Sequence, residues 1–446
     1  MSESERHLLV AHLAGANRVS AWVATLDAPV NGLRLVVGAT ERALPAAWQN
    51  YQAGGRTLRV QRVPLNGLAA RSRHELRLVD RGQVVATASA TTMPGYLPSP
   101  GERPFTLLLG SCFSVAQDPA GAAGATVSRL PAEARPELVV LTGDQVYLDS
   151  PALHFLKSTH KPDELAAEMI ASYVSTWAQH GTVGGYRRLL GAASSVYCSD
   201  DHDFWNNAPN PAPYVRDTWT RGGRTAWLDA ARRLFGLFQA EAAGATFNIG
   251  QMSVFVADTR FARAEDRSVF MPPTQLAALQ AWVRGLRAPG ALVTGQPIFT
   301  AETGWKGHFF DWSLPDFRQY RDLVAALSGT SHDILILTGD VHFGRVATCR
   351  LPNGRRLIEV IASPLALVHP FAAGKWSEAP SLFPTVAPPG VPQAPVTTEP
   401  YRRADDHFAT LGFTGVGATV RVSVTSWGIQ PALPPTGEVV YSTELH

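Results

Sequence analysis

The chain has 446 residues, of which 45% are hydrophobic and 17% are charged, a composition typical of a folded soluble protein with room for two or three domains. Its net charge is +2 and it has no long basic or acidic run, which argues against a nucleic-acid-binding tract. No segment is apolar enough for a membrane span, no export signal is evident, and three cysteines are too few for a disulfide framework. These features predict a cytoplasmic location.

Residues 1–98 are expected to form a small antiparallel β-sandwich of the fibronectin or immunoglobulin type. Short segments with alternating apolar residues are separated there by Gly, Pro, Asn and Asp, a spacing typical of such sandwiches. These segments are 7–15, 18–26, 33–40, 57–65, 74–80 and 83–92. Residues 93–104 are rich in proline and glycine, which indicates a linker. We therefore expect two domains, residues 1–98 and residues 99–446.

After the linker, short apolar runs alternate with helical patterns, which indicates an α/β layered fold whose strands are buried on both faces. The apolar runs are 105–112, 137–144, 194–201, 253–260, 291–298 and 333–340. The helical patterns are 163–179, 224–239, 274–286 and 314–328. Two more strand-like runs, 356–363 and 417–427, flank a proline-rich stretch, 383–400, that is expected to be a long surface loop beside a site.

Each of the six apolar runs ends in a polar cluster. In an open α/β sheet the carboxyl ends of the strands meet in one crevice, so these groups are expected to lie together. A single Gly-Asp after a strand is more often a turn, and a single Cys or His is more often structural. Several carboxylates in one crevice, however, repel one another unless cations lie between them. The sequence therefore predicts a metal site. The clusters are Ser111-Cys112, Asp144, 200–203, 258–260, Gln296 and Asp340-Val341-His342.

The motifs at these strand ends resemble those of the PhoD-like alkaline phosphatases, a branch of the metallophosphoesterase superfamily. They are GSCF (110–113), TGDQVYLD (142–149), SDDHDFWNN (199–207), ADTRF (257–261), PPTQLAALQAWV (272–283), TGQPIF (294–299) and TGDVHF (338–343). Commoner metallophosphoesterases have Asp-x-His where this chain has Ser111-Cys112-Phe113, which favours the PhoD-like branch. The resemblance implies an α/β (α+β) fold, with a layered β-sandwich core flanked by helices, for a catalytic domain over 99–446.

The resemblance also implies two kinds of metal ion. A ferric ion, Fe3+, would be bound by Cys112, Asp144, Tyr147 and His342. A calcium ion, Ca2+, would share Asp144 and add Asp340 and Asn206, although other divalent metals are possible. Asp201 stands where commoner relatives have a metal-binding Asn, so it is a further candidate, and the choice among the residues of 200–207 stays open.

The function implied is hydrolysis of a small-molecule or lipid phosphoester by a metal-activated hydroxide, with phosphomonoesters as the expected substrates. His202 is the candidate acid for the leaving group, and Asn207 and Gln296 are candidates for substrate binding. Arg260 either forks onto a phosphate oxygen or pairs with a nearby carboxylate. A phosphodiesterase or phospholipase of the same fold is the alternative. A non-catalytic binding protein that uses its N-terminal sandwich is a further one.

Overall fold

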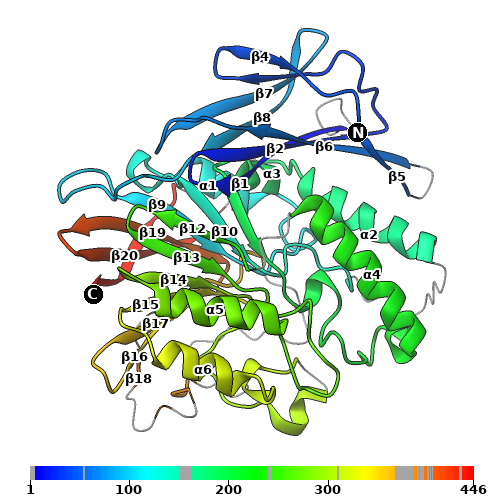
Figure 1. The fold of residues 1–446 in the computed structure, drawn as a ribbon. Helices are drawn as coiled ribbons and strands as arrows, with labels where there is room; N and C mark the ends of the chain where they lie inside the picture. The colour runs from blue at the N-terminus through cyan, green and yellow to red at the C-terminus, as the bar shows by residue number, and fades with distance from the viewer. Residues whose placement is uncertain are drawn as a thin grey trace.

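The computed structural model describes most of the chain, and Figure 1 shows its arrangement. The proline-rich loop expected at 383–400 lies mostly outside the described residues. None of the helices in the described part is long and apolar enough to cross a membrane. The described residues are 6–53, 56–150, 162–239, 244–308, 311–366, 385–388, 391, 396–398, 401, 403, 405–430 and 434–446.

Strands dominate the described part of the chain. The strands are β1 His7–Gly15, β2 Arg18–Leu26, β3 Arg34–Val37, β4 Thr40–Ala43, β5 Gln49–Ala53, β6 Arg56–Leu65, β7 Arg73–Asp80, β8 Gln83–Thr91, β9 Phe105–Gly110, β10 Leu138–Thr142, β11 Ser195–Cys198, β12 Thr246–Ile249, β13 Met252–Val256, β14 Gly290–Val293, β15 Ile334–Thr338, β16 Arg345–Arg350, β17 Arg356–Ile361, β18 Val396–Thr398, β19 His407–Val416, β20 Thr419–Gly428 and β21 Gly437–Leu445. The α-helices are α1 Ala122–Ser128, α2 Pro162–Trp177, α3 Tyr186–Leu190, α4 Arg221–Phe238, α5 Pro273–Gly285 and α6 Tyr320–Ser328.

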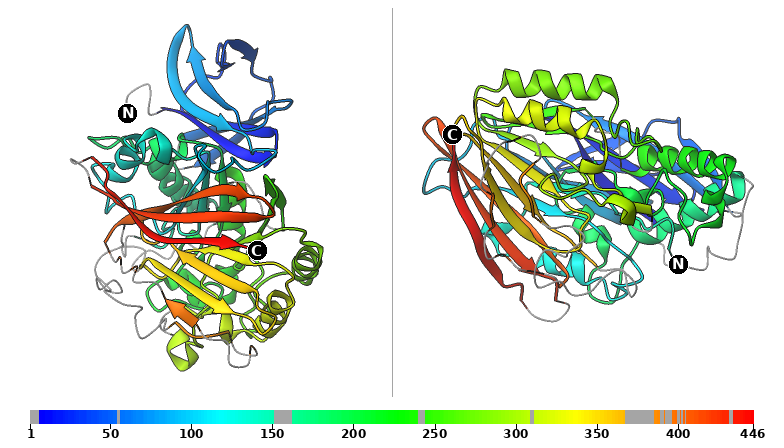
Figure 2. Two further views of the ribbon diagram at one scale, coloured as in Figure 1. Left: turned by 90° about the vertical axis from the view of Figure 1, so that its left-hand side faces the viewer. Right: turned by 90° about the horizontal axis from the view of Figure 1, so that it is seen from below.

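Two large sheets pack against each other to form the central core (Figure 2). One has ten strands in the order β21-β20-β19-β9-β10-β11-β1-β2-β6-β5, and the other has seven in the order β12-β13-β14-β15-β17-β16-β18. Leu107 and Leu109 of β9 lie in the same buried cluster as Leu335 and Leu337 of β15. Burial of these apolar side chains holds the sheets together. The central strands are almost continuous apolar runs in the sequence because both of their faces are buried.

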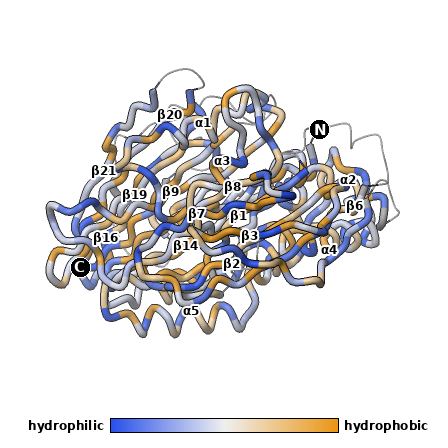
Figure 3. Tube along the Cα trace, turned by 90° about the horizontal axis from the view of Figure 1, so that it is seen from above, coloured by the Kyte–Doolittle hydropathy of each residue, from blue (hydrophilic) through white to orange (hydrophobic). Residues whose placement is uncertain are grey.

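Helices cover the outer faces of both sheets. α1 to α4 pack on one face of the ten-stranded sheet, where Trp22 of β2 donates a hydrogen bond from Nε1 to the carbonyl of Leu237 at 2.8 Å. α5 and α6 pack on the outer face of the seven-stranded sheet. The tube in Figure 3 shows apolar residues along the central strands, whereas α5 alternates between apolar and polar residues. This alternation is expected of a helix with one face in the core.

The N-terminal strands continue the ten-stranded sheet. β1 runs parallel to β11 through the pair His12 and Ser195, and β2, β6 and β5 follow it outward. On their other face these strands pack against a third sheet of four strands, in the order β4-β3-β7-β8. One continuous sheet therefore belongs to both the N-terminal layers and the central core.

The parallel strands place their carboxyl ends at one edge of the core. β9, β10 and β11 are parallel neighbours in one sheet, and β13, β14 and β15 are parallel neighbours in the other. The polar clusters that follow them are therefore brought together from both sheets.

Candidate metal centre

Four of the predicted metal ligands have left-handed backbone conformations immediately after strand ends. Their φ angles are 57° at Cys112, 58° at Asp144, 70° at Asp340 and 56° at His342. A non-glycine residue in this region costs about 1–3 kcal/mol and persists only where its surroundings hold it there. Residues strained in this way are concentrated at functional sites, so their grouping here marks the site.

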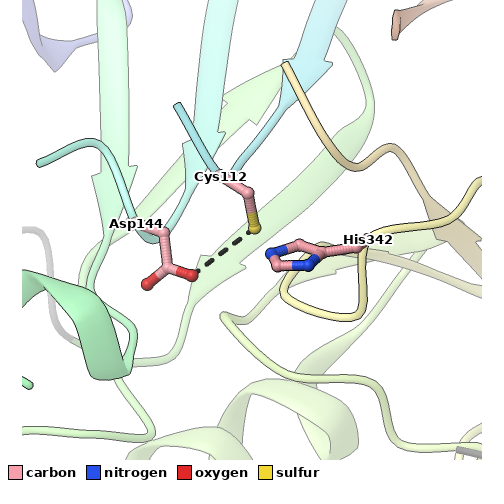
Figure 4. A group of neighbouring side chains, drawn as sticks. All are labelled: Cys112, Asp144 and His342. Atoms are coloured by element: carbon pink, nitrogen blue, oxygen red, sulfur yellow. Dashed lines mark hydrogen bonds between the residues drawn. The ribbon is translucent and has the colours of Figure 1, made fainter. Parts of the chain in front are cut away.

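One group of potential ligands consists of a thiol, a carboxylate and an imidazole (Figure 4). Ligand atoms of Cys112, Asp144 and His342 all lie within 4.8 Å of one another. The Cys112 Sγ is 3.5 Å from Asp144 Oδ2, and the Tyr147 hydroxyl is 3.4 Å from His342 Nε2. The phenol of Tyr147 thus lies beside this first group.

The electrostatics of the first group favour a cation. Burial, reinforced by neighbouring carboxylates, raises the pKa of the Cys112 thiol and of the Asp144 carboxyl well above their usual values. Burial also raises the pKa of Tyr147. An added metal ion would replace these protons and stabilise the anions. Burial lowers the pKa of His342 to about 3, so this ring is neutral and has a lone pair available for a metal.

A second group offers only carboxylate oxygens. Ligand atoms of Asp200, Asp201 and Asp340 lie within 4.8 Å of one another. One oxygen of each carboxylate is buried without a hydrogen-bond partner among the described residues, and so is Oδ1 of Asn207. Buried acceptors of this kind are rarely left unsatisfied. The three grouped carboxylates, each with an oxygen that has no hydrogen-bond partner among the described residues, suit a hard cation with oxygen ligands, such as Ca2+ or Mg2+.

Asp144 connects the two groups, because it also lies within 4.8 Å of Asp201 and His202. Its Oδ1 accepts the backbone N–H of His202 at 3.0 Å. Its own backbone N–H donates to Asp203 Oδ2, also at 3.0 Å. A carboxylate that belongs to neighbouring potential sites is suited to bridge two ions, and these bonds fix its orientation.

His202 is positioned to be a charged group beside this centre. Its Nδ1 lies 2.8 Å from Asp149 Oδ1, and its side chain is 17% exposed. Burial opposes protonation of the ring, but the carboxylates of Asp149 and Asp201 outweigh it and raise the pKa of His202 well above its usual value. The imidazolium is therefore the favoured form at neutral pH, with one side toward solvent.

The two neighbouring asparagines differ in their surroundings. Asn206 is half-buried, and its backbone N–H donates to Asp149 Oδ2 at 2.8 Å. Asn207 is buried, has a φ of 70°, and donates its backbone N–H to Asp201 Oδ2 at 3.2 Å. It is the side-chain oxygen of Asn207 that lies buried without a partner.

Arg260 and Gln296 are committed to a buried network. The Arg260 guanidinium donates to Asp200 Oδ1 from Nε at 3.0 Å and to Asp311 Oδ1 from Nη1 at 3.0 Å. The side chain of Gln296 donates a hydrogen bond from Nε2 to Asp311 Oδ2 and accepts one at Oε1 from the guanidinium of Arg263. Of the two roles that the sequence left open for Arg260, the structure has the carboxylate pairing. These contacts orient Asp200, whose pKa burial still raises to about 7 in spite of Arg260.

Some residues of this region were missed by sequence reasoning. Asp149 lies inside one of the quoted motifs, and its position in TGDQVYLD was an available signal. Asp311 follows no predicted strand, and nothing in its local sequence indicates that it lies beside Arg260. Ser363, whose hydroxyl donates to Cys112 Sγ at 3.2 Å, is the last residue of the strand-like run predicted at 356–363 but had no separate signal.

Comparisons with known proteins identify the fold. No protein-family model matches the sequence, and no curated protein matches it either. Among solved structures, the structure of PhoD superposes with a TM-score of 0.66 over 99% of this chain and 90% of that chain, at 13% sequence identity. A glycoside hydrolase family 2 member from Bacteroides cellulosilyticus DSM 14838 superposes with a TM-score of only 0.22 at 8% identity, over 99% of this chain and 75% of that one, and supports no conclusion.

The chain is thus a mixed α/β protein of several sheets and few helices. Its fold is that of PhoD, as the strand-end motifs predicted. An identity of 13% establishes the fold, and the chemistry rests on the residues described above.

Proposed function

We propose that this protein is a metal-dependent phosphoester hydrolase that acts on phosphomonoesters. The observation that carries the proposal is the Asp144 carboxylate between two unlike ligand groups. One has a thiol and an imidazole with the phenol of Tyr147 beside them, and the other has carboxylate oxygens without hydrogen-bond partners among the described residues. Soft and hard donors in adjacent groups suit two different metal ions. The PhoD-like fold supports the same reading.

The residues would be divided between the ions as follows. Cys112, Asp144, Tyr147 and His342 would hold the ferric ion, as the family resemblance implies. Asp144, Asp340 and Asn207 would hold calcium, with Asp201 and Asp200 beside them. Asn207 takes the place expected for Asn206, because its oxygen is the one that is buried and unpaired. When bound, the ions would neutralise charge on the phosphoryl oxygens and acidify a water nucleophile.

The remaining residues orient the ligands and handle protons. His202, held by Asp149, would donate its proton to the leaving alkoxide, and its partial exposure lets substrate approach the ring. Arg260 would act as a positioning residue for Asp200, because its guanidinium donors are used within the network. Gln296 would support Asp311 in the same way, which replaces the substrate-binding role expected from its position in the sequence.

The test is metal analysis combined with hydrolysis assays on the purified protein. We expect iron and calcium in the protein, hydrolysis of a chromogenic phosphomonoester in preference to the matching diester, and loss of iron and activity in Asp144→Ala. A visible tyrosinate-to-iron absorption band should disappear in Tyr147→Phe and persist in Tyr96→Phe, whose ring is 89% exposed.

Two results would count against the proposal. Protein that stays metal-free and colourless after iron and calcium are supplied, and that cleaves neither ester, would remove the enzyme assignment. Preferential cleavage of the diester would retain the metal centre and change the substrate to a phosphodiester.

A further inference from the structure

A cavity lies between the four-stranded sheet and the short helices α1 and α3. Figure 1 shows β8 above α1 and α3. The cavity has a volume of about 570 Å³, which is within the range of about 300–1,000 Å³ usual for small-molecule sites. It is lined by Arg73, Glu75, Thr87, Ala88, Ser89, Val127, Ser128, Arg135, Pro136, His180, Gly184, Arg187, Arg188, Gly191 and Ala192.

The lining of this arginine cavity is strongly cationic. Four arginines and one histidine face it, whereas Glu75 is its single carboxylate. Burial lowers the pKa of Arg73, and repulsion from Arg103 and Arg135 lowers it further, against an opposing effect of Glu137. The positive charges in this region are therefore not balanced by the carboxylates around them.

The arginines of the cavity fall into two kinds. Arg73 is used in the architecture, because its guanidinium donates to the carbonyls of Ala192 at 2.7 Å and Pro136 at 2.5 Å. These bonds fasten β7 to the loops that precede β10 and β11. Arg187 lies against His180.

The other two arginines have their side-chain donors available. Within the described part of the chain, the guanidinium groups of Arg135 and Arg188 have no hydrogen bond or ion pair, and both residues are exposed. One comes from the loop after residues 132–134 and the other from α3. Each guanidinium offers five donors in a planar fork that matches phosphate oxygens.

We propose that the arginine cavity binds a small polyanion that carries two or more phosphate groups. One phosphate would leave most of this volume empty, and it could not neutralise several cations in separate parts of the lining. A chain of phosphates can engage Arg135 and Arg188 together through charge-assisted hydrogen bonds, while Arg73 contributes its charge. The cavity shares no residue with the metal centre, so this inference is independent of the proposed hydrolase activity.

The first experiment is calorimetric titration of the full chain with inorganic tripolyphosphate at fixed ionic strength. In the double variant Arg135→Gln/Arg188→Gln, we expect the affinity of this site to fall at least tenfold, since two sets of charge-assisted hydrogen bonds are removed. The matched control is Arg284→Gln/Arg321→Gln, which removes the same charge from exposed positions on α5 and α6. The affinity of this control variant for tripolyphosphate should stay close to that of the wild type.

Binding at the metal centre is separated by the same titration of Asp144→Asn, which should keep the arginine-dependent component. A second readout is thermal unfolding, because a ligand that joins two layers of the native state raises its Tm. Tripolyphosphate should raise the Tm of the wild type and of the control more than that of the cavity variant.

Either of two outcomes would overturn the proposal. One is tripolyphosphate binding that is equal in the cavity variant and in the control. The other is inorganic phosphate that binds the cavity as tightly as tripolyphosphate, which would contradict a ligand with several phosphates.

Discussion

At the scale of single residues, the site depends on backbone conformations that the side chains themselves disfavour. Asp144 and Asp340 each follow a glycine, and both have left-handed φ angles. A Cβ at Gly143 would lie 2.4 Å from that of Asp200, and a Cβ at Gly339 would lie 2.2 Å from Ser111 Oγ. Glycine before each aspartate thus permits the close approach of neighbouring strand ends, which brings ligands from both sheets together.

The surroundings of the two asparagines lead to a first prediction. Asn207→Ala should weaken calcium binding by about tenfold or more, because it removes one of the four buried unpaired oxygens. Asn206→Ala should have a much smaller effect, since its contact with Asp149 is made by the backbone. Calcium titration of both variants by calorimetry measures the difference, and a larger loss in Asn206→Ala would restore that residue as the ligand.

A second prediction concerns Arg260. Arg260→Gln leaves Asp200 buried without its cation and Asp311 with Arg263 alone, so the free energy of unfolding should fall by about 3–5 kcal/mol. Arg260→Lys should recover only part of this stability, because an ammonium cannot bind both carboxylates as a planar fork. Urea unfolding measures both. An Arg260→Gln protein of unchanged stability but lower kcat would instead place Arg260 on the substrate.

At the scale of elements, α1 and α3 are in very close contact, which gives a third prediction. A Cβ at Gly124 of α1 would lie 1.8 Å from the carbonyl oxygen of Gly185, at the start of α3. Gly124→Ala should therefore cost about 1–3 kcal/mol or more in unfolding free energy, because a backbone must move. Gly236→Ala in α4 is the matched control.

The control variant, Gly236→Ala, is expected to raise the free energy of unfolding. A Cβ at Gly236 meets nothing within 4 Å among the described residues, and alanine favours a helix by up to about 1 kcal/mol over glycine. Urea unfolding of the two variants should differ clearly. Equal stabilities would mean that the two helices can separate without loss of packing.

The sequence predicted many of the strands and helices, whereas some strands had too little local pattern to be predicted. The segments 7–15 and 18–26 coincide with β1 and β2, because alternation with turn residues on both sides defines a strand well. β16, β19 and β21 were not predicted. β19 pairs with β9, which is distant in sequence, so its local pattern held little of the information that fixes it, whereas β16 and β21 pair with their sequence neighbours β17 and β20. The helix predicted at 314–328 begins only at Tyr320, after a short 3-10 turn.

For the candidate site, the sequence predicted which strand ends lie together but not how the side chains around them are arranged. The runs ending in Cys112, Asp144 and Asp340 were identified, because buried strands in parallel sheets have a common edge. Asn206 is half-buried, whereas its neighbour Asn207 is buried with a φ of 70°. The network of Arg260 depends on Asp311, which comes from a loop without periodicity. Neither feature has a local sequence signal.

At the scale of the whole molecule, the N-terminal strands and the central core are joined by one sheet. The segment 93–104, expected as a linker, is bonded on several sides: the backbone N–H of Gly250 donates to the carbonyl of Pro94 at 3.0 Å, and that of Gly415 donates to Pro98 at 2.8 Å. β1 and β11 meet at His12 and Ser195. A substitution that disturbs the pairing of β1 with β11 is therefore expected to affect the stability of the N-terminal layers and of the core together.

His12 makes this junction sensitive to acid. Its ring is buried between Trp22 and Tyr197, and neither ring nitrogen has a hydrogen-bond partner among the described residues. Burial, with a smaller contribution from Arg62, lowers the pKa of His12 to about 3. The unfolded chain has a histidine pKa of about 6.5, so it binds a proton that the native state excludes as the pH falls below that value.

The stability contributed by neutral His12 is therefore fully present above pH 6.5 and is lost progressively as the pH falls toward 3. Between pH 7.5 and pH 5, we expect the wild type to lose about 2 kcal/mol more unfolding free energy than His12→Met, which fills a similar volume and cannot be protonated. Urea unfolding at both pH values gives the two losses. Other buried histidines, such as His407, contribute equally to both proteins and cancel in the comparison. Equal losses would show that acid unfolds the molecule elsewhere and that the β1–β11 junction is not its acid-sensitive point.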